Sequence, residues 1–225
     1  MLRAGLQDLY NLPSLRSSLL AKDSSDVQFI ANHLVDMSIA MLSPSLLGPI
    51  LDVGCGSRPY DSYFTHLKKI NCDFDSKRGQ VDVECPATEL PFADASFNSI
   101  LCTEVLEHVP EPQKALREFY RVLQPGGRAL VSVPMWWPAH ELPHDFYRYP
   151  EHGLRYLAES AGFRVLKLIP RGGVYALIGQ IIMLGFSRYL PARVLRSFWN
   201  LFFLKLDAKR LNPSMTLGWT MLVER

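Results

Sequence analysis

The stretch Ile50-Leu51-Asp52-Val53-Gly54-Cys55-Gly56 decides how the rest of this chain folds. Ile50, Leu51 and Val53 are an apolar run with β-branched members, which predicts a short buried strand. The two glycines that follow let the backbone turn tightly and let a ligand approach the main chain closely. A short helix within Tyr60–Leu67 would complete a strand, a turn and a helix start, a geometry in which free amides converge where the strand ends.

The same stretch also indicates the charge of the ligand. The third glycine of the G-x-G-x-x-G dinucleotide fingerprint is absent, because proline occupies position 59. Asp52 stands directly before the turn, and a carboxylate there would repel a pyrophosphate. The turn therefore favours a cationic ligand without phosphate; the plainer alternative is an ordinary strand-to-helix turn.

Leu51–Gly56 resembles motif I of the class I S-adenosylmethionine-dependent methyltransferases, whose cofactor carries a sulfonium and an ammonium and no phosphate. Further stretches resemble the methyltransferase type 11 branch of this family; they are Glu89–Phe92 with Asp94–Asn98, Glu104–Val109 and Leu123–Gly127. The resemblance covers about residues 45–170. It implies an enzyme of class EC 2.1.1.- with S-adenosylmethionine as its cofactor.

The resemblance also implies where the cofactor binds. The turn would hold the methionine portion, and a carboxylate at the end of the second predicted strand, Lys69–Phe74, would accept hydrogen bonds from the ribose hydroxyls. Proline stands at position 86, where the family often has an acid for the adenine, so the backbone after it would replace that contact. The expected cofactor-binding residues are Asp52, Gly54, Cys55, Gly56, Asp73 with Asp75 as its alternative, Ala87, Thr88, Glu89, Thr103 and Glu104.

Residues 134–149 follow the fifth predicted strand and are dense in aromatic and titratable side chains. A loop in this position is where ligands bind in open α/β sheets. We expect it to hold the methyl acceptor. The expected catalytic residues, for removing a proton, are His140, His144 and Asp145, and the expected substrate-binding residues are Trp136, Tyr147 and Arg148. The alternative is a hydrogen-bonded lid with its aromatics in the core.

No metal site is expected, because Pro143 separates the two histidines of that loop and the cysteines lack zinc-ligand spacing. His108 is expected to fix a loop by hydrogen bonds rather than to act as a base. The four cysteines are interpreted as reduced, buried thiols of a cytoplasmic protein, since no C-x-x-C pair and no signal peptide is evident.

Composition limits the partners. A net charge of +2 gives no large electrostatic attraction to nucleic acid. The most apolar run, Val174–Phe186, is shorter than the ~20 residues that a spanning helix needs, so no transmembrane span is expected. A peripheral membrane contact stays open, as do a monomer and a homodimer.

Alternating strand and helix patterns predict an α/β fold, a doubly wound and mostly parallel sheet. The resemblance adds seven strands in the Rossmann-like methyltransferase order, with an antiparallel last strand. We expect one domain over residues 1–225. Its additions would be a helical N-terminal arm over 1–44, with a helix near 27–41, and a helical insertion or lid over 170–214 before the last strand.

The predicted reaction is direct SN2 displacement of the sulfonium methyl by an oxygen, or a nitrogen, of a small-molecule, sugar or lipid-linked acceptor. Two alternatives from other classes are a non-catalytic S-adenosylmethionine-binding module and, less well supported, an NAD-dependent oxidoreductase.

Overall fold

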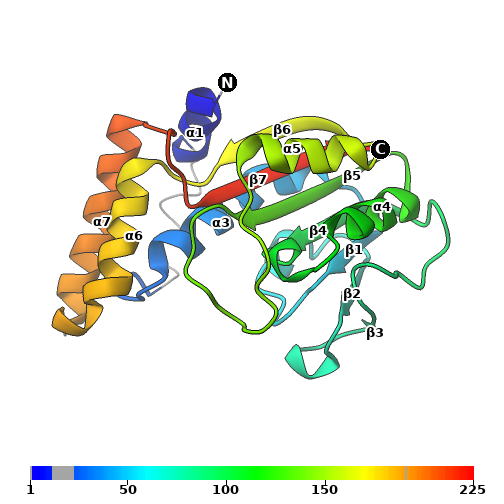
Figure 1. The fold of residues 1–225 in the computed structure, drawn as a ribbon, viewed down its shortest axis with the longest axis horizontal. Helices are drawn as coiled ribbons and strands as arrows, with labels where there is room; N and C mark the ends of the chain where they lie inside the picture. The colour runs from blue at the N-terminus through cyan, green and yellow to red at the C-terminus, as the bar shows by residue number, and fades with distance from the viewer. Residues whose placement is uncertain (1, 12–22, 191) are drawn as a thin grey trace. The chain divides into compact units, whose positions relative to one another are not determined.

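A computed structural model describes residues 2–11, 23–190 and 192–225. Seven strands form one sheet in the order β3-β2-β1-β4-β5-β7-β6 (Figure 1). The strands are β1 (Ile50–Val53), β2 (Lys69–Asp73), β3 (Val83–Glu84), β4 (Phe97–Thr103), β5 (Leu123–Pro134), β6 (Arg164–Pro170) and β7 (Gly218–Glu224). Strands β1 to β5 pair in parallel, and β7 is antiparallel. The predicted fold class is therefore confirmed.

Strand β1 lies at the centre of the parallel part of the sheet, and all four of its residues are buried. It pairs with β2 on one side and with β4 on the other, so that Asp52 lies beside Asn71 and Leu101. Apolar and β-branched residues suit a strand that is covered on both faces. Because parallel strands end at the same edge, the segments after β1, β2 and β4 meet there.

The connections on this side of the sheet are shorter than the sequence suggests. The helix expected within Tyr60–Leu67 is a single 3₁₀ turn, η2 (Asp61–Tyr63). The side chain of Arg58 donates to Asp61 at 2.8 Å, and serine, tyrosine and threonine in this segment favour helices only weakly. Between β2 and β3 the chain forms only another 3₁₀ turn, η3 (Ser76–Arg78), as the short spacing indicated.

Two α-helices belong to the sheet-containing part of the chain, α4 (Pro112–Val122) and α5 (Glu151–Ser160). Proline occupies the first turn of α4, where its missing N–H costs nothing. Strand β5 begins directly after α4, at Leu123, and runs through Gly126 and Gly127.

The chain divides into two compact units. One consists of Leu42–Leu168 with Thr220–Arg225, and the other of Met1–Met41 with Ile169–Trp219. The second unit contains helices α1 (Leu2–Tyr10), α3 (Phe29–Leu42, up to residue 41), α6 (Val174–Phe186) and α7 (Arg193–Arg210). The predicted N-terminal arm and insertion thus share one unit; residues 12–22 of the arm lie outside the described residues. A single domain over 1–225 stays a prediction.

Buried polar side chains hold the helical unit together. The carboxylate of Asp207, fully buried on α7, accepts hydrogen bonds from the amides of Gly173, Tyr175 and Ala176 at the start of α6. It also accepts one from the Tyr10 hydroxyl at 2.7 Å. These contacts satisfy amides that a helix start leaves without partners, so α7 caps α6.

Candidate cofactor site

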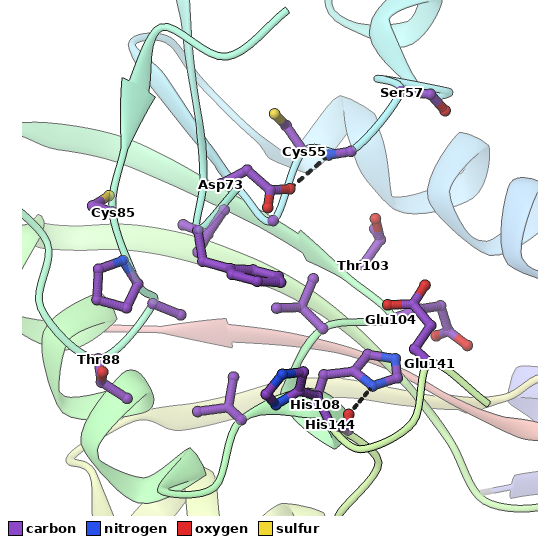
Figure 2. Close-up of a pocket in the computed structure, with 18 of the residues that line it drawn as sticks. Cys55, Ser57, Asp73, Cys85, Thr88, Thr103, Glu104, His108, Glu141 and His144 are labelled. Atoms are coloured by element: carbon purple, nitrogen blue, oxygen red, sulfur yellow. Dashed lines mark hydrogen bonds between the residues drawn. The ribbon is translucent and has the colours of Figure 1, made fainter. Parts of the chain in front are cut away.

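A cavity of about 540 Å³ lies where β1, β2 and β4 end (Figure 2). The segments that follow these three strands form its wall, together with residues 85–88 and two residues of the 134–149 loop, Glu141 and His144. All of these residues belong to the sheet-containing unit. The parallel strand ends therefore bring together segments that are up to about ninety residues apart in the sequence, as expected for an open α/β sheet.

The glycine turn lines the cavity, but its amides are not free. Gly54 and Cys55 donate to the carbonyl of Cys72 at 2.8 and 3.1 Å, and Gly56 donates to Oδ2 of Asp73 at 3.0 Å. The expectation that three free amides would converge on the ligand is therefore wrong. The turn instead fastens the end of β1 to the end of β2 and presents its backbone surface to the cavity.

Both glycines of the turn are required, for different reasons. Gly54 has φ 69°, and a Cβ there would lie 2.3 Å from Cγ2 of Val105. Gly56 has φ 48°, and a Cβ there would meet nothing within 4 Å. The first position needs glycine for packing as well as for its left-handed backbone; the second leaves open space that a ligand can occupy.

Asp52 does not contact the cavity. Its side chain is buried, and its Oδ2 accepts a hydrogen bond from Nζ of Lys69 at 2.9 Å. Lys69 also pairs with Asp61, so the lysine charge is shared between two carboxylates. Burial raises the pKa of Asp52, and the lysine opposes this rise. The expectation that this carboxylate meets a cationic ligand is corrected: it anchors the turn through Lys69.

Asp73 is the carboxylate that lines the cavity at the end of β2. Its Oδ2 accepts from the Gly56 amide, and its Oδ1 accepts from the Asp75 amide at 3.2 Å. A carboxylate has about four acceptor sites, so further hydroxyl groups can still bind to it. Asp75 does not line the cavity and instead accepts from the amide of Lys77. Of the two ribose candidates, only Asp73 has the required position.

The expected adenine edge lines the cavity in part. Ala87 and Thr88 line it, whereas Glu89 does not. The Glu89 amide closes a turn on the carbonyl of Pro86. Phe74, directly after β2, also lines the cavity, and its side chain is 53% exposed. No role was predicted for this residue, although an apolar ring directly after the acid at the end of β2 was a usable signal.

Thr103 and Glu104 line the cavity at the end of β4, as predicted. Glu104 has φ 53°, a backbone conformation that costs energy for a residue other than glycine. Its amide donates to the carbonyl of Ser132 at 3.0 Å, and its Oε1 accepts from the Ser132 hydroxyl at 2.8 Å. Ser132 of the neighbouring strand β5 thus holds both the strained backbone and the carboxylate of Glu104 in a fixed orientation at the cavity.

Of the three predicted catalytic residues, only His144 lines the cavity. Asp145 is fully engaged elsewhere: both of its oxygens accept from the Arg148 guanidinium, at 2.6 and 2.9 Å, and Oδ2 accepts from the His140 amide. These hydrogen bonds, chiefly those from Arg148, hold the pKa of Asp145 well below its usual range. A depressed pKa makes Asp145 a weak base, and both of its oxygens already accept hydrogen bonds, which argues against its expected role in removing a proton.

The predicted substrate-binding residues lie outside this cavity. The Arg148 guanidinium also donates to the carbonyls of Trp137, Pro138 and Tyr147, so it clamps the loop. The Tyr147 hydroxyl donates to the carbonyl of Pro110 at 2.9 Å. Trp136 is 38% exposed. These hydrogen bonds agree with the alternative of a hydrogen-bonded lid, but the exposed Trp136 and Tyr147 do not agree with its aromatics being in the core. Glu141, which sequence reasoning did not select, lines the cavity.

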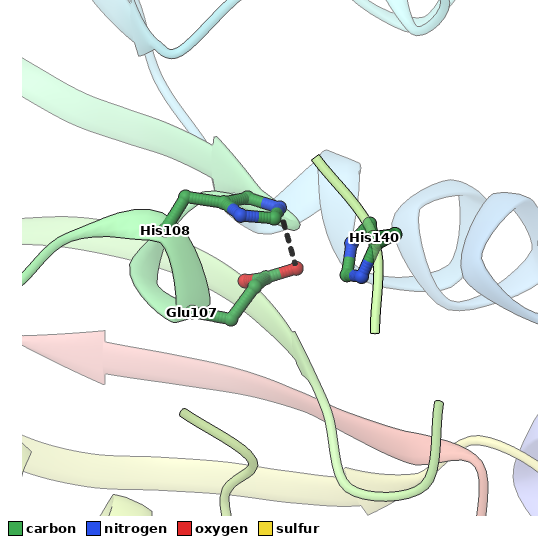
Figure 3. Close-up of side chains that lie close together, drawn as sticks. All are labelled: Glu107, His108 and His140. Carbon is green, nitrogen blue, oxygen red and sulfur yellow. Dashed lines mark ion pairs between the residues drawn. The ribbon is translucent and has the colours of Figure 1, made fainter. Parts of the chain in front are cut away.

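Glu107, His108 and His140 lie close together beside the cavity (Figure 3). Nδ1 of His108 donates to the His144 carbonyl at 2.5 Å, so this histidine does fix the loop as expected, but it also lines the cavity. Its Nε2 lies 3.8 Å from the buried Glu107 carboxylate. The three side chains offer ligand atoms within 4.8 Å of one another. A carboxylate with two imidazoles can bind a divalent metal, so the absence of a metal stays a prediction.

The charge of the cavity matches one kind of ligand. Three carboxylates line it, those of Asp73, Glu104 and Glu141, and no lysine or arginine is among the lining residues that the structure describes. Such a wall favours a cation and disfavours phosphate.

Burial, with two carboxylates nearby, raises the pKa of the Cys55 thiol to about 11, so this residue is no nucleophile at neutral pH.

A sheet of this order with an antiparallel seventh strand is the class I methyltransferase fold. Within it, residues 51–131 belong to the S-adenosylmethionine-dependent methyltransferases of that class. Residues 51–131 match the family described as "Methyltransferase domain". S-adenosylmethionine is the cofactor of this family, and the acidic, hydroxyl-accepting cavity is chemically suited to it.

Two curated relatives are similar over part of the chain. The demethylmenaquinone methyltransferase of Paenarthrobacter aurescens is 33% identical over 118 residues, covering 46% of each chain. The ubiquinone/menaquinone biosynthesis C-methyltransferase UbiE of Haemophilus ducreyi is 40% identical over 93 residues, 35% of this chain and 36% of that protein. The match therefore spans less than half the length of either relative.

A solved structure agrees over more of the chain. The S-adenosylmethionine-dependent methyltransferase from Archaeoglobus fulgidus matches with a TM-score of 0.56 at 16% identity, covering 85% of this chain and 93% of that one. At this identity the likeness concerns the fold alone. Among the described residues, no helix is both long and apolar enough to cross a membrane.

Proposed function

We propose that this protein transfers the methyl group of S-adenosylmethionine to an oxygen or a nitrogen of a small-molecule, sugar or lipid-linked acceptor. The observation that carries the proposal is the acidic cavity at the strand ends, lined by Asp73, Glu104 and Glu141. An ammonium and a sulfonium are stabilised in such surroundings, and a pyrophosphate is repelled. This argues against the NAD-dependent oxidoreductase that sequence alone left open.

For each part of the cofactor, the cavity offers residues of suitable chemistry. Asp73 would accept hydrogen bonds from the ribose hydroxyls. The turn at Gly54–Gly56 would accommodate the methionine portion against bare backbone, with Glu104 as a candidate partner for its ammonium group. The backbone at Ala87 and Thr88 would border the adenine, and the exposed ring of Phe74 offers it an apolar face.

When bound, S-adenosylmethionine supplies a methyl group on a sulfonium, which is already a strong electrophile. The protein then has to align the acceptor, exclude water and accept a proton. His144 and His108 are the two imidazoles of the cavity wall, and His108 is held by its Nδ1 contact to the His144 carbonyl. We infer that one of these imidazoles takes the proton from the attacking hydroxyl or amine.

Calorimetry on the whole chain tests the cofactor. S-adenosylhomocysteine should bind, and NADH at the same concentration should not. Failure of S-adenosylhomocysteine to bind at millimolar concentration would contradict the proposal. The acceptor can be sought with methyl-labelled S-adenosylmethionine and small-molecule extracts, by following the label into product with mass spectrometry.

A carbon acceptor is a second candidate, because the names of both curated relatives place them in quinone methylation and one is named as a C-methyltransferase. The match to the family ends at residue 131, however, before the loop that borders the cavity at Glu141 and His144. A non-catalytic S-adenosylmethionine-binding module is the remaining rival. Such a module would bind the cofactor but would form no labelled product with any extract. A labelled product would instead identify the acceptor atom directly.

A further inference from the structure

The helices α6 and α7 carry an unusual concentration of exposed apolar side chains. Of the sixteen large apolar side chains exposed in the described part of the chain, eight lie between residues 178 and 202. They are Ile178, Ile181, Phe186, Tyr189, Val194, Leu195, Phe198 and Phe202. Scattered apolar residues on a surface need no explanation, but a contiguous group marks an interaction site.

On α7 these side chains follow one face. Exposed positions recur at steps of three and four, at Leu195, Phe198, Phe202, Lys205 and Lys209, which we call the α7 stripe. The rings of Phe198 and Phe202 stack with centroids 6.2 Å apart. The opposite face, with Asn200, Phe203, Leu204 and Asp207, is buried within the helical unit. The helix therefore has an inner apolar face that packs and an outer one that meets solvent.

The turn between α6 and α7 continues this surface. Phe186, Tyr189 and Val194 have exposed fractions of 56%, 63% and 82%. The guanidinium of Arg188 lies over the Tyr189 ring, 4.7 Å from its centroid, and Arg193 is exposed beside Val194. Aromatic rings with cations next to them are the combination found where proteins meet a lipid headgroup layer.

The exposed charges of α6, α7 and the turn between them are all positive. Residues 174–210 contain six lysines and arginines and one acid, Asp207. That acid is fully buried and bonds the start of α6. Arg193 is paired with Asp23 of the N-terminal segment, and the two lysines of the α7 stripe are exposed. The solvent-facing side of the two helices is thus apolar and cationic.

We propose that the α7 stripe, with the α6–α7 turn, binds the surface of an anionic lipid bilayer. The aromatic and aliphatic side chains would enter the boundary between headgroups and acyl chains, and the lysines and arginines would pair with lipid phosphates. At 18 residues, α7 is about 27 Å long and would lie along the surface. It does not qualify as a membrane-spanning helix.

A second copy of this chain is a poorer occupant. A two-fold interface places the same patch on both sides. The cations around the α7 stripe would then face cations, and the segment offers no exposed carboxylate to balance them. An anionic bilayer supplies the missing charge and takes up apolar side chains without requiring a shaped pocket.

Co-sedimentation of the full-length chain with vesicles tests the proposal, and it needs no cofactor, so its result is independent of methyl transfer. Binding to phosphatidylcholine vesicles containing phosphatidylglycerol should exceed binding to pure phosphatidylcholine by about tenfold and should weaken as salt is added. Equal binding to both vesicles, or no binding, would overturn the proposal.

Three variants locate the surface. Phe198→Ser with Phe202→Ser should remove most vesicle binding, and Lys205→Gln with Lys209→Gln should remove much of its salt-sensitive part. Tyr156→Ser is the matched control, because Tyr156 is an aromatic residue 70% exposed on α5 in the other unit; its binding should equal that of the wild type. Circular dichroism melts check that each variant folds.

Light scattering separates the remaining outcome. One outcome would show that the α7 stripe is a subunit interface and that the lipid proposal is wrong. In it, the wild type is a dimer, the Phe198→Ser with Phe202→Ser variant is a monomer, and neither protein binds vesicles. A wild type that binds anionic vesicles and a variant of unchanged oligomeric state that does not would support it.

Discussion

The amide of Gly56 donates a hydrogen bond to Oδ2 of Asp73 at 3.0 Å, which joins the glycine turn after β1 to the carboxylate at the end of β2. The turn and the acid therefore form one structural unit. The bond orients the Asp73 carboxylate at the cavity wall, and it occupies an amide that sequence reasoning had given to the ligand.

Substituting Asp73→Asn should weaken S-adenosylhomocysteine binding about tenfold or more, because hydrogen bonds to a charged group contribute about 1.5–3 kcal/mol. Isothermal titration calorimetry measures the change. Asp75→Asn is the control, since that side chain only accepts from the Lys77 amide outside the cavity and its loss should leave affinity unchanged. Equal losses in both variants would argue against Asp73 as the ribose contact.

Gly54→Ala and Gly56→Ala should fail in different ways. Both place an L residue at positive φ, which costs about 1–2 kcal/mol. Gly54→Ala also drives a methyl group into Val105, so it should lose more unfolding free energy in a denaturant titration. Gly56→Ala puts its methyl in open space and should keep most of its stability while losing cofactor affinity. A Gly56→Ala protein with wild-type affinity would contradict the placement of the ligand.

Arg148→Gln should loosen the 134–149 loop. The variant removes the guanidinium that bridges Asp145 to the carbonyls of Trp137 and Pro138. Hydrogen exchange of this loop should become faster, whereas the affinity for S-adenosylhomocysteine should change little. Arg155→Gln, on the surface of α5, is the control, because Arg155 makes only a partly exposed pair with Glu159. An unchanged exchange rate in the Arg148 variant would show that the clamp does not hold the loop.

The same clamp predicts a pH dependence. Hydrogen bonds from Arg148 depress the pKa of Asp145 in the folded state. A carboxylate with a depressed pKa contributes stability that is fully present above its unfolded value, about 3.9. This stability is lost as pH falls through the depressed folded value. Loop protection should therefore persist from neutral pH to about pH 4 and decline only in stronger acid. A loss of protection between pH 7 and 5 would contradict this assignment.

His144→Asn should lower the rate of methyl transfer by about 10²–10⁴-fold if this imidazole takes the acceptor's proton, with cofactor affinity retained. His140→Asn is the comparison, because His140 lies outside the cavity wall. A full rate in His144→Asn with a strong loss in His108→Asn would assign the role to His108.

In the 134–149 loop, sequence reasoning predicted the region of the site but not which side chains reach the cavity. The sequence identified residues 134–149 as a site region from composition, but it could not separate His144, at the cavity, from His140 and Asp145, which are engaged within the loop. Residues four and five apart in a proline-broken segment have no fixed relative direction. Their orientation follows from the Arg148 clamp, which no local pattern specifies. Asp52 was misplaced for a similar reason, since its partner Lys69 lies on the neighbouring strand.

Local sequence by itself determined the strand and turn at Ile50–Gly56, the parallel sheet, and Asp73 as the acid at the next strand end. These depend on the residue-by-residue patterns of strands and on the glycine turn. Tertiary structure alone decided which carboxylates face the cavity, which amides remain for a ligand, and that residues 1–41 and 169–219 share a helical unit. Those outcomes depend on partners far apart in sequence, such as Tyr10 and Asp207, which meet only when the chain has packed.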